Sequence, residues 1–68
     1  MNGTATRWND AVGSGLIDAG ASGAFAFQRR NCSQRLQSAL SQQGPPQQVT
    51  FNVSPLSGDA INVDLAGA

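Results

Sequence analysis

The sequence predicts an α+β fold in which one long or broken helix over residues 8–43 precedes a β-hairpin over residues 49–65. Three observations lead to this prediction. Small residues recur at every fourth position after Trp8, the run Gly44-Pro45-Pro46 is a strong helix stop, and the apolar period becomes two from Val49 onward. We therefore expect one small domain over residues 1–68, with a flexible lead-in (1–7), a linker (44–48) and a tail (66–68), and without an independent globular core.

The first half of the helical segment reads WNDAVGSGLIDAGASGAFAF. In a helix, residues four apart lie on one face, so the smallest side chains would form a smooth groove suited to close helix packing. Four glycines in this segment oppose helix formation by about 4 kcal/mol in total, which leaves flexible chain as the alternative. The predicted packing interface consists of Ala11, Gly15, Ala19 and Gly23, and the predicted anchors are Trp8, Leu16, Phe25, Leu36 and Leu40.

The composition changes after Phe27 to QRRNCSQRLQSALSQQ, where glycine is absent. Cys32, Leu36 and Leu40 continue an apolar strip at helical spacing. A break near residues 30–31 would divide the segment into two helices, and the sequence leaves both forms open.

From Val49 the residues alternate between apolar and polar, and SPLSGDA supplies turn residues between two such runs. A lone hairpin is marginally stable in water, so we expect its apolar face to dock on the helix or on a neighbouring molecule. This predicted docking face consists of Val49, Phe51, Val53, Ile61, Val63 and Leu65.

The charge composition favours a protein that is held in an assembly. The formal net charge is zero and only 12% of the residues are charged, so a general attraction to nucleic acid or to acidic membranes is not indicated. One cysteine cannot form an internal disulfide, and a chain without histidine is a poor candidate for a zinc site. Oligomerisation or docking on a larger body is the expected source of stability.

A catalytic set is not expected, because the chain contains no histidine, lysine, glutamate or tyrosine. We expect no enzyme activity, no cofactor and no metal site. Cys32 has two interpretations: neighbouring arginines could lower its pKa and make it reactive, or it could be a small buried apolar residue in line with Leu36 and Leu40.

Arg29, Arg30 and Arg35 form the one basic cluster in the sequence. They are candidate phosphate contacts, while a solvated helix face, salt bridges to a partner and a position at a membrane boundary are alternatives.

A secretory leader is not expected from the first residues, MNGTAT. Residues 11–27 would be a poor membrane-spanning helix, since Asp18 lies at their centre.

The run GSGLIDAGASGAFAFQRRNCSQRLQSALSQQ resembles the minor virion proteins of bacteriophages, the pilot and internal ejection proteins, and VTFNV is similar to strands of phage tail proteins. The resemblance implies a multi-copy component of a virus particle that lies among coat, portal or tail proteins. It assigns no functional residue.

The function predicted from these observations is a non-enzymatic structural or assembly protein of a virion, whose partners are copies of itself or larger virion proteins. One alternative is a membrane-active oligomerising peptide, such as a pore former or a bacteriocin, located at a host membrane or secreted. A third is a small nucleic-acid-binding module that uses Arg29, Arg30 and Arg35.

Overall fold

The computed structural model describes residues 1–66 and shows a five-stranded antiparallel sheet with one short α-helix. The elements along the chain are β1 (Asn2–Asn9), β2 (Ser14–Asp18), the 3-10 turn η1 (Gly20–Ser22), β3 (Ala24–Gln28), the 3-10 turn η2 (Arg29–Asn31), α1 (Gln34–Gln42), β4 (Gln47–Val53) and β5 (Ala60–Leu65). The predicted long helix followed by a separate hairpin is therefore wrong.

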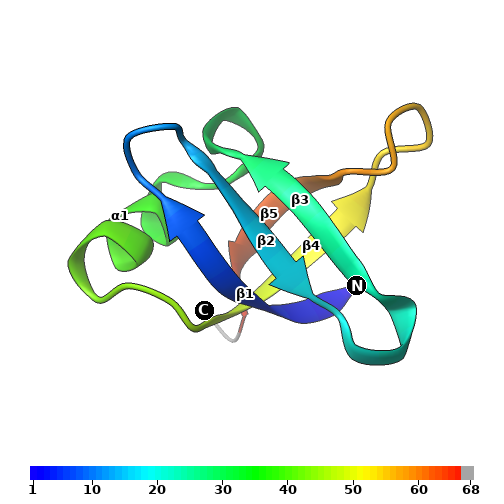
Figure 1. The fold of residues 1–68 in the computed structure, drawn as a ribbon, viewed down its shortest axis with the longest axis horizontal. Coiled ribbons are helices and arrows are strands. Elements are labelled where there is room, and N and C mark those ends of the chain that lie inside the picture. Colours follow the sequence, from blue (N-terminus) through cyan, green and yellow to red (C-terminus); the bar gives the residue numbers. More distant parts are fainter. Residues whose placement is uncertain (67–68) are drawn as a thin grey trace.

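The strand order is β3-β2-β1-β4-β5, so β4 returns across the molecule to pair with β1 rather than with β3. This is a Greek-key arrangement, in which three consecutive strands are joined by a fourth that lies beside the first. Figure 1 shows β4 and β5 crossing behind β1, β2 and β3. The sheet curls until β5 approaches β3, and an isolated parallel bridge joins Cys32 to Val63. The result is a half-barrel.

Ten buried residues form the core between the two parts of the curled sheet and α1. Strand residues supply most of them, and Leu36 and Leu40 come from the inner side of α1. The predicted absence of an independent core is therefore wrong. The core consists of Ala5, Ile17, Phe27, Cys32, Leu36, Leu40, Val49, Phe51, Ala60 and Val63.

Residues 8–31 form strands and turns because a spacing of four also fits a strand. Every fourth residue of a strand lies on the same face, so the pattern read as helical is equally compatible with period two. Ile17 and Phe27 point into the core, whereas Leu16 and Ala26 are exposed on the opposite face. The glycines explain why the segment forms strands and turns instead of a helix. Gly13, Gly20 and Gly23 have positive φ angles of 77°, 64° and 92° at the turns.

The predicted helix-packing groove does not exist as one surface. Ala11 lies in the β1–β2 loop, Gly15 lies within β2, Ala19 precedes η1, and Gly23 separates η1 from β3. These four residues share no helix face. The predicted flexible lead-in is also different in the structure, since residues 2–7 belong to β1. Residues 67–68 of the predicted tail lie outside the described residues.

The helix α1 begins and ends at local signals. The Ser33 side chain accepts a hydrogen bond from the Leu36 backbone N–H at 3.2 Å, which caps the N-terminus. Gly44 has a φ angle of 78° and donates its backbone N–H to the Ala39 carbonyl at 3.1 Å, which ends the helix. The helix spans Gln34–Gln42, a small part of the predicted segment.

The predicted hairpin residues lie on β4 and β5, but they are integrated into the sheet. Val49, Phe51 and Val63 are buried, while Val53, Ile61 and Leu65 are half-buried. The pairing register shifts between Thr50 and Asn52, and Asn62 has a φ angle of 53°. This bulge interrupts the alternation on β5, so Ala60 occupies an inner position in place of Ile61.

Gly15 lies between Trp8 and Phe27 in one cross-strand row. The two aromatic rings stack across it, with centroids 5.6 Å apart and planes inclined by 16°. A Cβ atom at Gly15 would lie 2.4 Å from the Arg7 carbonyl oxygen and 2.8 Å from Phe27 Cζ, which no real contact allows. Glycine is required here by the close approach of its neighbours.

We expect Gly15→Ala to lower the free energy of unfolding by about 2 kcal/mol or more, because the added methyl group must displace a backbone carbonyl and the Phe27 ring. Chemical denaturation measures the loss, and the near-ultraviolet circular dichroism of Trp8 should change as the stack is disturbed. Gly44→Ala is the control, since a Cβ there meets no atom and the cost is limited to about 1–2 kcal/mol for the left-handed backbone. An unchanged Trp8 signal in Gly15→Ala would contradict the role of the stack.

Candidate binding surface

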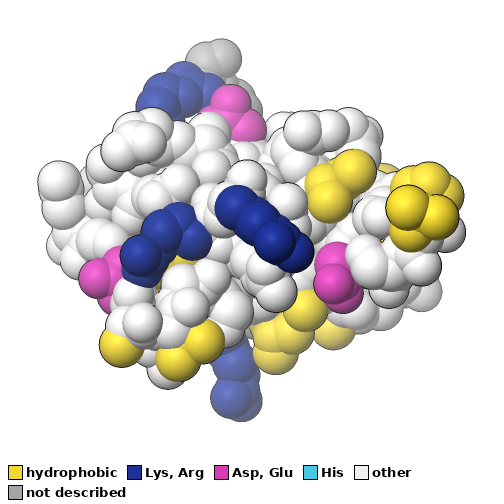
Figure 2. Space-filling model, turned by 90° about the horizontal axis from the view of Figure 1, so that it is seen from above, with side chains coloured by type: hydrophobic (Ala, Val, Ile, Leu, Met, Phe, Trp, Pro, Cys, Tyr) yellow, Lys and Arg dark blue, Asp and Glu magenta, His cyan; other side chains and the backbone are white. Residues whose placement is uncertain are grey.

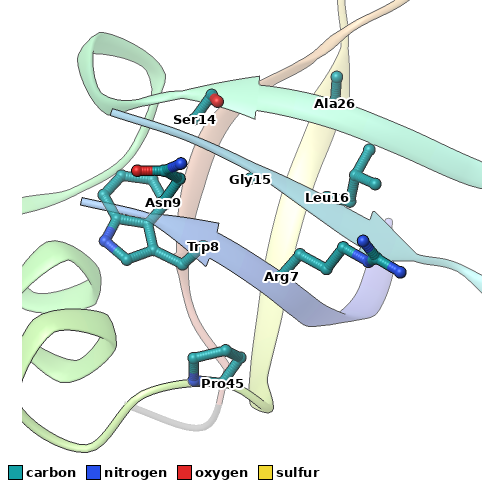
Figure 3. A pocket seen from close by; sticks show the side chains of 8 residues that line it. All are labelled: Arg7, Trp8, Asn9, Ser14, Gly15, Leu16, Ala26 and Pro45. Carbon is teal, nitrogen blue, oxygen red and sulfur yellow. The ribbon is translucent and has the colours of Figure 1, made fainter. Parts of the chain in front are cut away.

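A hollow lies on the outer face of the three-strand meander β1–β2–β3. Arg7, Leu16 and Ala26 are neighbours across the strands and are all exposed, so their side chains share this face. We call this the Arg7 hollow, and its volume is about 570 Å³. It is lined by Arg7, Trp8, Asn9, Ser14, Gly15, Leu16, Ala26 and Pro45 (Figure 3).

The walls of the Arg7 hollow come from three strands and one loop. Leu16, 39% exposed, and Ala26 form its apolar floor. Pro45, from the loop between α1 and β4, lies across from the strands in Figure 3. Trp8 is half-buried: its ring packs on Phe27 and its indole Nε1 donates to Asp10 Oδ1 at 3.3 Å. The hollow is therefore mostly apolar and has polar groups at its rim.

A second, smaller hollow of about 320 Å³ adjoins the first, because Ser14 lines both. We call it the Arg30 hollow; it is lined by Val12, Gly13, Ser14, Gln28, Arg29 and Arg30. The Arg29 backbone N–H donates to the Gly13 carbonyl at 2.7 Å and fixes η2 against the β1–β2 loop. The two hollows therefore share one residue of β2.

The structure separates the three arginines that the sequence grouped. Arg29 donates to the Asp10 backbone carbonyl, approaches the Asp10 carboxylate at 3.6 Å, and lies over the Trp8 ring at 5.9 Å from its centroid. Arg35 pairs with Asp64 at 2.9 Å and lines neither hollow. Arg30 lines the Arg30 hollow. Among residues 1–66, Arg7 and Arg30 have no ion pair.

Arg7 is the basic residue that the sequence analysis missed. The sequence feature that could have indicated Arg7 is its position next to Trp8, which places a cation beside an aromatic side chain. Figure 2, which views the molecule from above relative to Figure 1, shows the basic side chains as separate groups with white and apolar surface between them, so the side seen there carries no continuous basic patch.

The other predicted anchors divide between the core and the surface. Leu36 and Leu40 are buried, Phe25 is half-buried with its ring 5.4 Å from that of Phe51, and Leu16 points outward into the Arg7 hollow.

Asp10 connects the β1–β2 loop to α1. Its carboxylate accepts hydrogen bonds from Ser41 Oγ at 2.9 Å and from Trp8 Nε1 at 3.3 Å. The pKa of Asp10 is lowered by the hydrogen bond from Ser41, then by that from Trp8, and further by the charge of Arg29. The hydrogen bond from Trp8 Nε1 to Asp10 holds the indole at the edge of the Arg7 hollow.

Cys32 lies in the core beneath η2, and burial raises the pKa of its thiol despite the nearby charge of Arg29. Its backbone forms the bridge to Val63 that closes the half-barrel. Its position is that of a packed apolar side chain.

No group of three histidine, cysteine, aspartate or glutamate side chains in residues 1–66 is placed to hold a metal ion. No helix in the same residues is long and apolar enough to cross a membrane. Compared with known proteins, the chain matches no family model, no curated protein and no solved structure.

We expect the Asp10 carboxyl group to titrate below its ordinary pKa in the folded protein, and Ser41→Ala to raise that pKa toward its ordinary value. NMR titration of the side-chain carboxyl carbons measures both values. Ser38→Ala is the matched control, because Ser38 is exposed on the same helix and makes no hydrogen bond to Asp10.

The same shift predicts how stability depends on pH. Because the pKa is lower in the folded state, the stabilisation by Asp10 is fully present above the unfolded pKa and is lost as the pH falls through the folded pKa. Asp10→Asn should therefore lose less thermal stability on acidification than the native chain. An equal loss in both proteins would contradict this role.

We expect the Cys32 thiol to react slowly with a thiol reagent at neutral pH and rapidly once denaturant unfolds the chain, since the thiol is buried and its pKa is raised. The colour released by an aromatic disulfide reagent measures the rate. Fast labelling of the folded protein would contradict the buried position.

Proposed function

We propose that this protein is a non-catalytic module that binds single-stranded nucleic acid on the outer face of β1–β2–β3. The observation that carries the proposal is the Arg7 hollow, an apolar depression with Arg7 and Trp8 at its edge on the three-strand meander of a half-barrel. The proposal takes up the nucleic-acid-binding alternative that the sequence left open. It places a phosphate contact at Arg7 in place of Arg35.

The architecture supports this proposal by analogy. A five-stranded, partly open Greek-key barrel is the arrangement of the OB-fold, which binds oligonucleotides and oligosaccharides on strands 2 and 3 and the adjoining loops. Here the first three strands form the meander, β4 pairs with β1, and β5 approaches β3 after α1. Because one fold serves many functions, the fold alone does not assign a function, and the chemistry of the site must agree with it.

The side chains that line the two hollows suit an unpaired strand. Proteins that bind single strands combine cations along the backbone path with surfaces on which bases stack. Arg7 and Arg30 lie in neighbouring hollows that share Ser14, and neither is neutralised by an ion pair within the described residues. The floor of Leu16 and Ala26 and the edge of Trp8 supply apolar area for a base.

The low net charge sets the expected strength of binding. Two unpaired arginines correspond to about two phosphate contacts, so log Kd should change with log salt by a slope of roughly 1.4 for a single strand. With so few phosphate contacts we expect weak binding, and its affinity should depend strongly on the contacts made inside the Arg7 hollow.

The virion assembly role stays a prediction. Its structural basis was the helix groove, and residues 11–23 form loops, strand and turn instead.

We expect a mixed-sequence single strand of about 12 nucleotides to bind and to change the fluorescence of Trp8, the one tryptophan of the chain. Arg7→Gln should weaken binding about tenfold and reduce the salt slope by roughly 0.7, because one phosphate contact is lost. Fluorescence anisotropy of labelled strands at several salt concentrations measures both effects.

Arg35→Gln is the control, since Arg35 is paired with Asp64 and lies outside both hollows. It should leave the affinity and the salt slope unchanged. Lack of binding by the native chain at about 50 mM salt, or an equal loss in the two variants, would exclude this function.

A further inference from the structure

The sheet has two edge strands, β3 and β5, and within residues 1–66 only β5 is covered. At β5 the pairing register with β4 is shifted, and Asn62 has a left-handed φ angle of 53°. The Val63 carbonyl accepts the Ser33 backbone N–H at 2.8 Å, and Cys32 forms an isolated bridge to Val63. A bulge and a covering segment both keep an edge strand from pairing with another chain.

The edge of β3 has neither kind of protection. Its sequence is AFAFQ, without charge or proline, and its register with β2 continues from Ala24 to Gln28 without a shift. Among residues 1–66 no other strand pairs with its outer side. In Figure 1, β3 forms the border of the front layer and β5 passes behind it. Natural proteins protect edges with lysine, proline or a bulge, so an unprotected apolar edge is a template for a further strand.

The ladder between β2 and β3 fixes which backbone groups of β3 face outward. Just beyond one end of the ladder, the Arg29 N–H donates to the Gly13 carbonyl at 2.7 Å. Just beyond the other end, the Ala19 N–H donates to the Gly23 carbonyl at 2.8 Å. Both bonds continue the register of the ladder, and hydrogen-bonded residue pairs alternate with non-bonded pairs in an antiparallel sheet. Every second residue of β3, counted from either bond, therefore bonds to β2.

This alternation assigns Phe25 and Phe27 to β2 and leaves the backbone groups of Ala24, Ala26 and Gln28 facing away from it. No other backbone hydrogen bond within residues 1–66 uses the N–H or C=O group of these last three residues. All three are exposed. The free groups lie symmetrically about Ala26, so the edge is complementary to an antiparallel copy of itself.

We propose that β3 pairs antiparallel with β3 of a second copy of this chain, centred on Ala26, and that the protein forms a homodimer through one continuous sheet. In this register Ala26 faces Ala26 of the second copy and Ala24 faces its Gln28, and each pair exchanges two hydrogen bonds. On the inner face Phe25 of one copy lies opposite Phe27 of the other, at the shorter spacing of a non-bonded pair. Cross-strand aromatic pairs are favourable, and β3 carries no charge that would oppose a like charge.

A second copy suits this edge better than an unrelated strand. It supplies alanine opposite alanine and an aromatic ring opposite the half-buried Phe25. The formal net charge of zero adds no repulsion between copies. One pair of five-residue strands buries a small area, so we expect a transient dimer instead of a permanent one. The pairing uses no nucleic acid and goes beyond the proposed function.

Two measurements on the native chain, without nucleic acid, test the pairing. Sedimentation equilibrium from about 10 μM to about 1 mM should show a monomer–dimer equilibrium. Over the same range, NMR hydrogen exchange at the Ala24, Ala26 and Gln28 amides should slow as the concentration rises, because these groups become hydrogen-bonded only in the dimer. The Phe25 and Phe27 amides bond to β2 and should be protected at every concentration.

Charges at the centre of the strand test the register. Ala26→Lys places two lysines opposite each other in the dimer and Ala26→Glu two glutamates, so each variant alone should raise the dimer dissociation constant about fivefold or more. An equal mixture of the two variants places opposite charges across the axis, and association should return to at least the native level. Leu56→Lys is the matched control, since Leu56 is 97% exposed between β4 and β5, and it should leave the dissociation constant unchanged. Unchanged thermal unfolding of the variants shows that the fold is retained.

A chain that remains monomeric at about 1 mM would overturn the proposal. A dimer in which exchange at the Ala24, Ala26 and Gln28 amides does not depend on concentration would also overturn it, because the contact would then lie elsewhere. Equal weakening by Ala26→Lys and Leu56→Lys would have the same meaning, and failure of the mixed Ala26 variants to associate would contradict the register. These measurements contain no nucleic acid, so their outcome is separate from that of the proposed function.

Discussion

The stack of Trp8 on Phe27 across Gly15 is the interaction on which the arrangement of the first three strands depends. The rings approach to 5.6 Å because the residue between them has no side chain. Phe27 belongs to the core, so the stack joins the inner face of β3 to the end of β1. On the opposite face the same register brings Arg7, Leu16 and Ala26 side by side. The inner packing therefore determines where the outer hollow forms.

Charge in this protein is used for a few local connections. Arg29 and Asp10 join η2 to the β1–β2 loop, and Arg35 and Asp64 join α1 to β5. Both pairs are exposed, and exposed pairs contribute little to stability. The first pair fixes η2 and the β1–β2 loop beside the Arg30 hollow, whereas the second lies outside both hollows. Within residues 1–66, Arg7 and Arg30 have no ion pair, so a chain with zero net charge still presents cations without a carboxylate partner there.

Sequence patterns were informative where one local signal determined the structure. Gly44 ends α1 as a left-handed residue, and the alternation around Val49 and Phe51 marks β4. The meander was misread because its apolar residues recur at a spacing shared by helix and strand. Arg30, one of the three arginines that the sequence singled out, lines a hollow, while Arg7 and Leu16 lie together only because of cross-strand pairing.

The sequence by itself determined the charge balance, the absence of the usual catalytic side chains, the C-terminal limit of α1 and the strand character of residues 49–53. These properties depend on composition or on neighbours within a few residues. Only the tertiary structure decided that β4 pairs with β1, that Gly15 separates two stacked rings, and that Arg7 and Pro45 line one hollow. The reason is that pairing between distant segments is set by which faces can be buried together, and one sequence pattern permits several such pairings.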